Sequence, residues 1–152
     1  MSAEELEVVV LGEPQQQGSK NPWGGDANKN LMPWRAVCKA MVDEAMKDQG
    51  FEYVLSGPVY VICTFRFSRP RSHYRTGKNA HLLRPSSPHY KTSKPDTDKL
   101  QRAVGDALTG VAIKDDSQIV KWGTVKVYGD SPRTELLIGR LDDEGSIPET
   151  FR

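Results

Sequence analysis

The spacing of apolar residues predicts two strands and one helix in the first half of the chain. A β-branched apolar run predicts a buried strand over 6–11, and strict alternation predicts a second strand over 59–67. Helical spacing predicts a helix over about 33–47, with Gly50 just past its end as a C-terminal cap. The apolar stripe expected for this helix comprises Ala36, Val37, Ala40, Met41, Ala45 and Met46.

A second helix and two further strands are predicted in the other half. Asp96 or Thr97 is suited to begin this helix and Gly110 to end it. Its expected buried stripe comprises Leu100, Ala103, Val104, Ala107 and Leu108. Residues 118–128 predict a strand, and 134–138 are expected to pair back with it as a hairpin.

This order of elements predicts an α+β fold: a single domain over 1–140 with a mixed sheet and two main helices. We expect the polar tail at 141–152 to be frayed. Residues 68–93 have neither helical nor strand periodicity, and a stretch of that length without structure is usually functional or disordered. We therefore expect 68–93 to contact the substrate and to be mobile when no substrate is bound.

Composition and charge narrow the function classes. The 37% hydrophobic and 27% charged fractions are typical of a globular protein, and no apolar run is long enough to span a membrane. The acidic beginning is unlike a signal peptide, so a cytoplasmic location is expected. Two cysteines and three histidines show no zinc-type spacing, and Cys38 and Cys63 are expected to be small buried hydrophobes.

Positive charge is concentrated in one part of the chain. Residues 66–102 contain ten basic and two acidic residues, a net +8, although the whole chain carries only +1 and the remainder therefore −7. A localised positive segment on an acidic protein favours a polyanion site. A solvated basic loop is the alternative interpretation.

Four aspartates flank the second predicted helix, and their chemistry suits a divalent metal. In an extended approach Asp96 and Asp98 would point to the same side, and the turn after the helix can return Asp116 beside them. Such oxygen ligands favour Mg²⁺ or Mn²⁺, which can activate water for phosphodiester hydrolysis. Arg102, one helical turn beyond Asp98, could stabilise charge on the phosphate.

Each aspartate also has a structural interpretation. Asp96 or Asp98 could simply cap the helix, and the pair Asp115 and Asp116 could be a polar turn before a strand. Asp106 is expected to face solvent. The joint pattern inside the basic half of the chain is what favours a metal site.

Three consecutive motifs resemble a known family. The segments KPDTDKLQR, DALTG and KDDSQIV, within about 28 residues, are similar to the pattern of the RusA-like Holliday junction resolvases of phages and prophages. These crossover-junction endodeoxyribonucleases show D-x-D-N-L-x-K, then D-A-L-x-G and D-D-x-Q-[IV]. The segment GEPQQQGSKN also resembles an N-terminal segment of phage members.

The resemblance implies a Mg²⁺-dependent homodimer, with Mn²⁺ as a possible substitute, that places symmetric nicks in two strands of a four-way DNA junction. By position, the metal-binding catalytic carboxylates are Asp96, Asp98 and Asp116. Asp115 would support these ligands without binding the metal itself. Two residues depart from the family pattern. Lys99 replaces its usual Asn, and Arg102 replaces its catalytic lysine, so Arg102 could clamp phosphate at some cost in rate.

DNA contacts are expected mainly from the basic segment. The candidates for phosphate binding are Lys20, Arg69, Arg71, Arg75, Lys91, Lys94 and Lys99. Phosphate contacts position DNA without reading its sequence, which predicts binding selective for branched structure. Trp23 and Trp34 could stack on exposed bases, or could be partly buried.

Two other functions fit parts of the sequence. A DNA-binding accessory protein that no longer catalyses would explain Arg102 in place of lysine. A transferase that uses a D-x-D motif on a nucleotide sugar is the third possibility, but the chain has no Gly-rich phosphate loop and this function leaves the basic segment unexplained.

Overall fold

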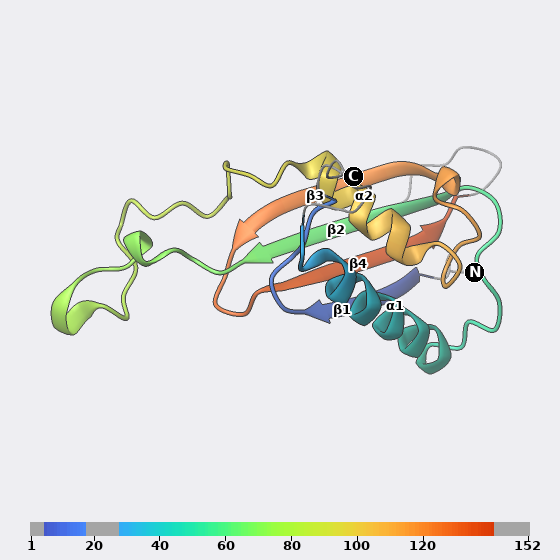
Figure 1. The fold of residues 1–152 in the computed structure, drawn as a ribbon, viewed down its shortest axis with the longest axis horizontal. Helices are drawn as coiled ribbons and strands as arrows, with labels where there is room; N and C mark the ends of the chain where they lie inside the picture. The colour runs from blue at the N-terminus through green and yellow to red at the C-terminus, as the bar shows by residue number, and fades with distance from the viewer. Residues whose placement is uncertain (1–4, 18–27, 142–152) are drawn as a thin grey trace.

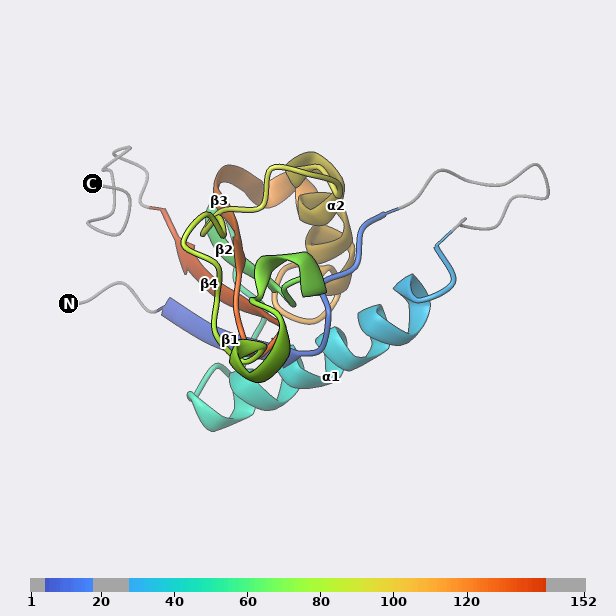
Figure 2. The ribbon, with the colours of Figure 1, turned by 90° about the vertical axis from the view of Figure 1, so that its left-hand side faces the viewer.

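The computed structural model describes residues 5–17 and 28–141, which form one mixed sheet and two helices. The strands are β1 (Glu5–Leu11), β2 (Val59–Phe67), β3 (Ile119–Tyr128) and β4 (Arg133–Arg140). The helices α1 (Leu31–Asp48) and α2 (Thr97–Leu108) lie together on one face of the sheet (Figure 1, Figure 2). The α+β prediction is confirmed; of the tail predicted to be frayed, residues 142–152 lie outside the described part.

The order of the strands is β1-β4-β2-β3, and it corrects the predicted hairpin. β4 lies between β1 and β2, antiparallel to both, while β3 pairs parallel with β2 at the sheet edge. The short connection after β3 therefore passes the end of β2, where the Gly129 N–H donates to the Phe67 carbonyl at 2.9 Å. In this central position β4 hydrogen-bonds along both edges and buries Leu136 and Ile138.

Alternation along the strands places one face of the sheet beneath the helices. Its buried residues are Leu6, Val8, Val10, Val59, Val61, Cys63, Phe65, Phe67, Leu136 and Ile138. All five residues of the stripe predicted for α2 are buried against this face. No helix in the described residues is long and apolar enough to cross a bilayer.

The stripe predicted for α1 was right for three of its six residues: Met46 is buried, and Met41 and Ala45 are partly buried and pack against the core. The buried side chains are spaced three or four apart and are Leu31, Trp34, Cys38, Val42 and Met46, whereas Ala36, Val37 and Ala40 are exposed. The helix packs through Trp34 because this large ring buries more apolar area than the alanines would. Trp34 is only 6% exposed, so the base-stacking role suggested for it is also wrong; Trp23 lies outside the described residues.

Both cysteines behave as buried hydrophobes, as expected. Cys38 on α1 and Cys63 on β2 are free thiols within the core. Burial raises the pKa of Cys38 to about 12 and also raises that of Cys63, where the neighbouring Cys38 adds to the effect. The thiols therefore remain protonated near neutral pH and are poor nucleophiles.

The opposite face of the sheet is crossed by Tyr60, whose ring lies over Gly139. A Cβ added at Gly139 would lie 2.3 Å from the Tyr60 hydroxyl oxygen and 2.4 Å from its Cζ. Tyr60 is 1% exposed and its hydroxyl donates to the Glu5 carboxylate, so the ring has little freedom to move. Glycine is therefore required at this position by close packing.

We expect Gly139→Ala to lower the free energy of unfolding by about 2–3 kcal/mol, because the added methyl group overlaps a buried ring. Urea denaturation measures the change, with Gly129→Ala as the matched control. A Cβ at Gly129 meets the Arg66 side chain at an ordinary 3.8 Å. Equal stability of the two variants would contradict the assigned packing.

Candidate functional site

Asp96 and Asp98 lie at the N-terminus of α2, where both carboxylates are exposed. Asp96 is the N-cap residue, with φ −75° and ψ 151°, but its side chain makes no capping hydrogen bond. Both residues were expected to lie on an extended segment before the helix. This expectation is wrong for Asp98, which already lies within the first turn of α2. Within the described residues neither carboxylate has a hydrogen-bond or ion-pair partner, which leaves their oxygens available to a ligand.

Asp116 begins the short helix η3 (Asp116–Gln118), and its neighbour Asp115 caps it. The Asp115 carboxylate accepts the Ser117 N–H at 2.9 Å, and hydrogen bonds from the Ser117 side chain and backbone lower the pKa of Asp115. Asp115 thus has a structural role in this turn. The Asp116 side chain is exposed and unpartnered in the described part of the chain.

Gln118 fixes this turn to the segment that precedes β2. Its amide oxygen accepts the N–H groups of Lys114 and Asp115 at 2.8 and 3.0 Å. Its amide nitrogen donates to the carbonyls of Leu55 and Gly57 at 3.0 and 2.9 Å. The glutamine of the D-D-x-Q motif therefore holds the backbone that carries Asp116.

Asp116 packs against Gly105 of α2, at some distance from the first two carboxylates. A Cβ added at Gly105 would lie 3.5 Å from the Asp116 Cβ. One stripe of the helix carries Asp98, Arg102 and Gly105. Gly105 lies seven residues after Asp98, which corresponds to about 10 Å along the helix axis. The turn thus returns Asp116 to this stripe, with Arg102 between it and Asp98. It does not return it directly beside Asp98.

The donor set suits a hard divalent cation, although no three such side chains converge here. Among the described residues no group of three His, Cys, Asp or Glu could hold an ion as placed. Mg²⁺, however, commonly takes only one or two carboxylates and completes its shell with water and substrate phosphates. Asp96 and Asp98 could provide such a pair, with Asp116 further along the same helix.

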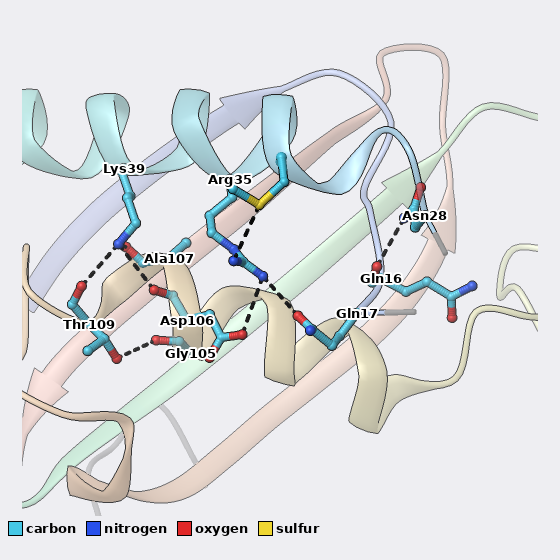
Figure 3. A network of polar contacts seen from close by, with 10 residues as sticks. Gln16, Gln17, Asn28, Arg35, Lys39, Gly105, Asp106, Ala107 and Thr109 are labelled. Atoms are coloured by element: carbon cyan, nitrogen blue, oxygen red, sulfur yellow. Dashed lines mark hydrogen bonds and ion pairs between the residues drawn. The ribbon is translucent and has the colours of Figure 1, made fainter. Parts of the chain in front are cut away.

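A polar network fixes α2 against α1 (Figure 3). Arg35 pairs with Asp106 at 3.4 Å and donates to the Gln17 amide oxygen at 2.9 Å. Asp106 is therefore half-buried and paired, which corrects its expected exposure to solvent. Lys39 donates to the carbonyls of Asp106, Ala107 and Thr109 at 3.2, 3.4 and 3.0 Å and caps the C-terminus of α2.

Lys126 of β3, which was not among the residues predicted from the sequence, holds the segment that leads to Asp96. Its ammonium donates to the carbonyls of Ser93 and Pro95, both at 2.8 Å. One turn into α2, Gln101 donates to the Thr124 hydroxyl at 2.6 Å. A lysine on the helix-covered face of a strand was the available signal, since such a lysine needs a specific partner.

We expect Lys126→Met to reduce DNA cleavage by roughly 10–100-fold, as the loss of a group that orients a ligand typically does. The carbonyls of Ser93 and Pro95 lose their donor, and Asp96 loses its fixed position. The measurement is the cleavage rate at saturating DNA together with the Mg²⁺ concentration for half-maximal rate. Lys114→Met, an exposed lysine, is the charge control. An unchanged cleavage rate together with an unchanged Mg²⁺ requirement in Lys126→Met would contradict a positioning role.

Residues 68–93, here called the basic arm, extend beyond the end of the sheet (Figure 1). They contain the short helices η1 (Arg71–His73) and η2 (Gly77–Asn79), and Tyr74 bridges to Leu83. Lys91 donates its N–H to the Lys126 carbonyl at 3.0 Å, which joins the end of the arm to β3. The arm thus has more local structure than its lack of periodicity suggested.

The structure places the predicted DNA contacts in three different settings. Arg69, Arg71 and Arg75 line one pocket on the basic arm. Lys91 is used by the fold: its ammonium lies 5.2 and 5.3 Å from the ring centroids of Phe67 and Tyr128. The remaining predicted phosphate contacts are Lys94, which is exposed, Lys99, which is half-buried on α2, and Lys20, which lies outside the described residues.

Exposed carboxylates among basic residues on an α+β scaffold are the features of a protein that acts on a polyanion. The family model for endodeoxyribonuclease RusA matches residues 12–139. The chain belongs to this family, which confirms the resemblance. It is also 35% identical over 142 residues, covering 88% of this chain and 94% of the relative, to the uncharacterized protein YqaN of Bacillus subtilis (strain 168).

Proposed function

We propose that this protein is a Mg²⁺-dependent endodeoxyribonuclease that resolves four-way DNA junctions by paired, symmetric nicks. The observation that carries the proposal is the placement of three exposed carboxylates, none with a partner among the described residues, and of Arg102 along one side of α2, next to the basic arm. Neighbouring aspartates with structural roles are engaged, as Asp106 is by Arg35 and Asp115 by Ser117. Membership in the RusA family supports the same reaction.

Each residue of the site has a defined task in this proposal. Asp96 and Asp98 would hold Mg²⁺, which Mn²⁺ could replace, and Asp116, further along α2, would complete the site through bound water or substrate phosphate. When bound, the ion would supply Lewis-acid chemistry that activates water and offsets charge on the scissile phosphate. Arg102 would orient that phosphate and stabilise the charge that develops on it. Lys94 and Lys99 would contact the neighbouring backbone.

The proposal includes a homodimer that works on DNA in the cytoplasm. A four-way junction has near two-fold symmetry, and a two-fold dimer would present one site to each of the two strands that are cut. One site per subunit would also account for paired nicks.

The test is cleavage of a synthetic four-way junction and a matched linear duplex in the presence of Mg²⁺, Mn²⁺ or EDTA. We expect paired nicks in opposing strands of the junction with either metal, and none with EDTA or on the duplex. Equal cleavage of junction and duplex would contradict structure selectivity. Cleavage in EDTA would contradict the metal requirement.

A non-catalytic DNA-binding accessory protein is the second candidate. Two observations favour it: Arg102 in place of the family's lysine, and the two helical turns between Asp98 and the Gly105 position against which Asp116 packs. This alternative predicts tight junction binding with no cleavage under either metal. The same assay therefore decides between the two functions.

A further inference from the structure

The basic arm contains a pocket lined by three arginines, separate from the carboxylates of α2. Arg69, Arg71 and Arg75 line a cavity of about 330 Å³ together with Tyr74 and Ala80. The arm has six lysine and arginine residues and no acidic residue. In the described part of the chain these three guanidinium groups form no ion pair.

The backbone of the arm gathers these arginines, although their charges repel one another. The Arg75 N–H donates to the Leu82 carbonyl at 2.8 Å, and the Arg84 N–H donates to the His73 carbonyl at 2.8 Å. These two bonds close residues 73–84 into a small hairpin. Positive charges held together with no acidic partner among the described residues favour an anion from outside.

Two of the arginines are fixed while leaving donors unused. One terminal nitrogen of Arg69 donates to the Pro88 carbonyl at 2.7 Å, and the guanidinium lies 5.4 Å from the Tyr128 ring centroid. In the described part of the chain Arg75 donates through its Nε alone, to the Leu83 carbonyl at 3.2 Å. Arg71 is exposed and makes no hydrogen bond through its side chain among the described residues. The remaining N–H groups are suited to bidentate binding of phosphate oxygens.

The pocket and Asp96 lie at the same end of the sheet, joined by a series of contacts. Arg69 lies over Tyr128, and two residues earlier on β3 Lys126 holds the carbonyl of Pro95, next to Asp96. One nucleic-acid strand or branch could therefore occupy the pocket while another part of the same molecule reaches the carboxylates. The described residues that line the pocket include no carboxylate, so the pocket would bind phosphate without cleaving it.

We propose that this arginine pocket binds a phosphodiester group of the DNA substrate away from the scissile phosphate, and so anchors one branch of the junction. The proposal rests on the proposed function for the identity of its ligand. It adds a discrete binding site where the charge of the arm alone would give only diffuse attraction.

The test compares four variants of the full-length protein in junction binding by fluorescence anisotropy over a range of salt concentrations. We expect Arg71→Ala and Arg75→Ala each to weaken binding about tenfold and to reduce the slope of log K against log salt by about 0.9, one phosphate contact. Arg71→Lys keeps the charge but loses the bidentate geometry, and is expected to weaken binding nearly as much. Lys78→Ala removes the same charge from η2, outside the pocket, and should have less than about a threefold effect.

Wild-type affinity of Arg71→Lys, with equal losses for Lys78→Ala and Arg71→Ala, would overturn the pocket and leave only the diffuse charge of the arm. Arg71 is exposed, and its side chain makes no hydrogen bond or ion pair among the described residues, so its replacement does not threaten folding. If the wild-type protein never cleaves the junction, the proposed nuclease is refuted. A loss of junction affinity in Arg71→Ala and Arg75→Ala would still support the pocket in that case.

Discussion

Asp96→Asn is expected to lower junction cleavage by about 10³-fold or more, with unchanged or higher affinity for the junction. Asparagine is nearly the same size as aspartate, and the Asp96 side chain makes no capping hydrogen bond that the change could break. What is lost is the negative charge of one proposed metal ligand. The same charge repels the DNA backbone, so its removal favours binding.

Separate measurements of binding and cleavage distinguish this outcome from a folding defect. Cleavage is followed at saturating junction with Mg²⁺, and affinity is measured with Ca²⁺ or EDTA, where no turnover is expected. Asp48→Asn, an exposed aspartate at the end of α1 with no partner in the described residues, is the control and should behave as wild type. A folded Asp96→Asn variant that loses binding along with cleavage would contradict the assigned role.

Local periodicity predicted the elements well where one pattern dominated. The stripe of α2 was confirmed because only one set of apolar residues in that segment has helical spacing. In α1, alanines and methionines allow several stripes, and only packing against the sheet selects the one through Trp34 and Cys38. The position of β4 between β1 and β2 depends on pairing between distant segments, which adjacency in the sequence could not reveal.

The sequence motifs identified the family and the exposed carboxylates, but not the residues that hold them in place. Gln118 was part of a recognised motif, yet its four hydrogen bonds involve backbone groups as far away as Leu55. Lys126 and Lys39 act on carbonyls that only the fold brings near them. The separation of Asp116 from Asp98 likewise depends on where the turn after α2 meets the helix, at Gly105.

Arg102→Ala is expected to reduce the rate of junction cleavage by about 10²–10³-fold, with a smaller loss of binding. Arg102 is exposed, forms no ion pair in the described structure, and lies one turn from Asp98 on the stripe that leads to Asp116. A cation at this position would stabilise the negative charge that develops on the scissile phosphate. Because that charge is greatest in the transition state, its loss should reduce the rate more than the affinity.

Arg102→Lys restores the residue that the family pattern has at this position, and it makes the prediction specific. If a compact ammonium serves the reaction better than a guanidinium, this variant should cleave at least as fast as wild type. Single-turnover rates at saturating junction and Mg²⁺ provide the comparison, with Lys114→Ala as a control for the loss of one exposed positive charge. Wild-type rates for Arg102→Ala would show that the family's catalytic cation has no counterpart at this residue. Stabilisation of the transition state would then have to come from elsewhere on α2 or from the basic arm.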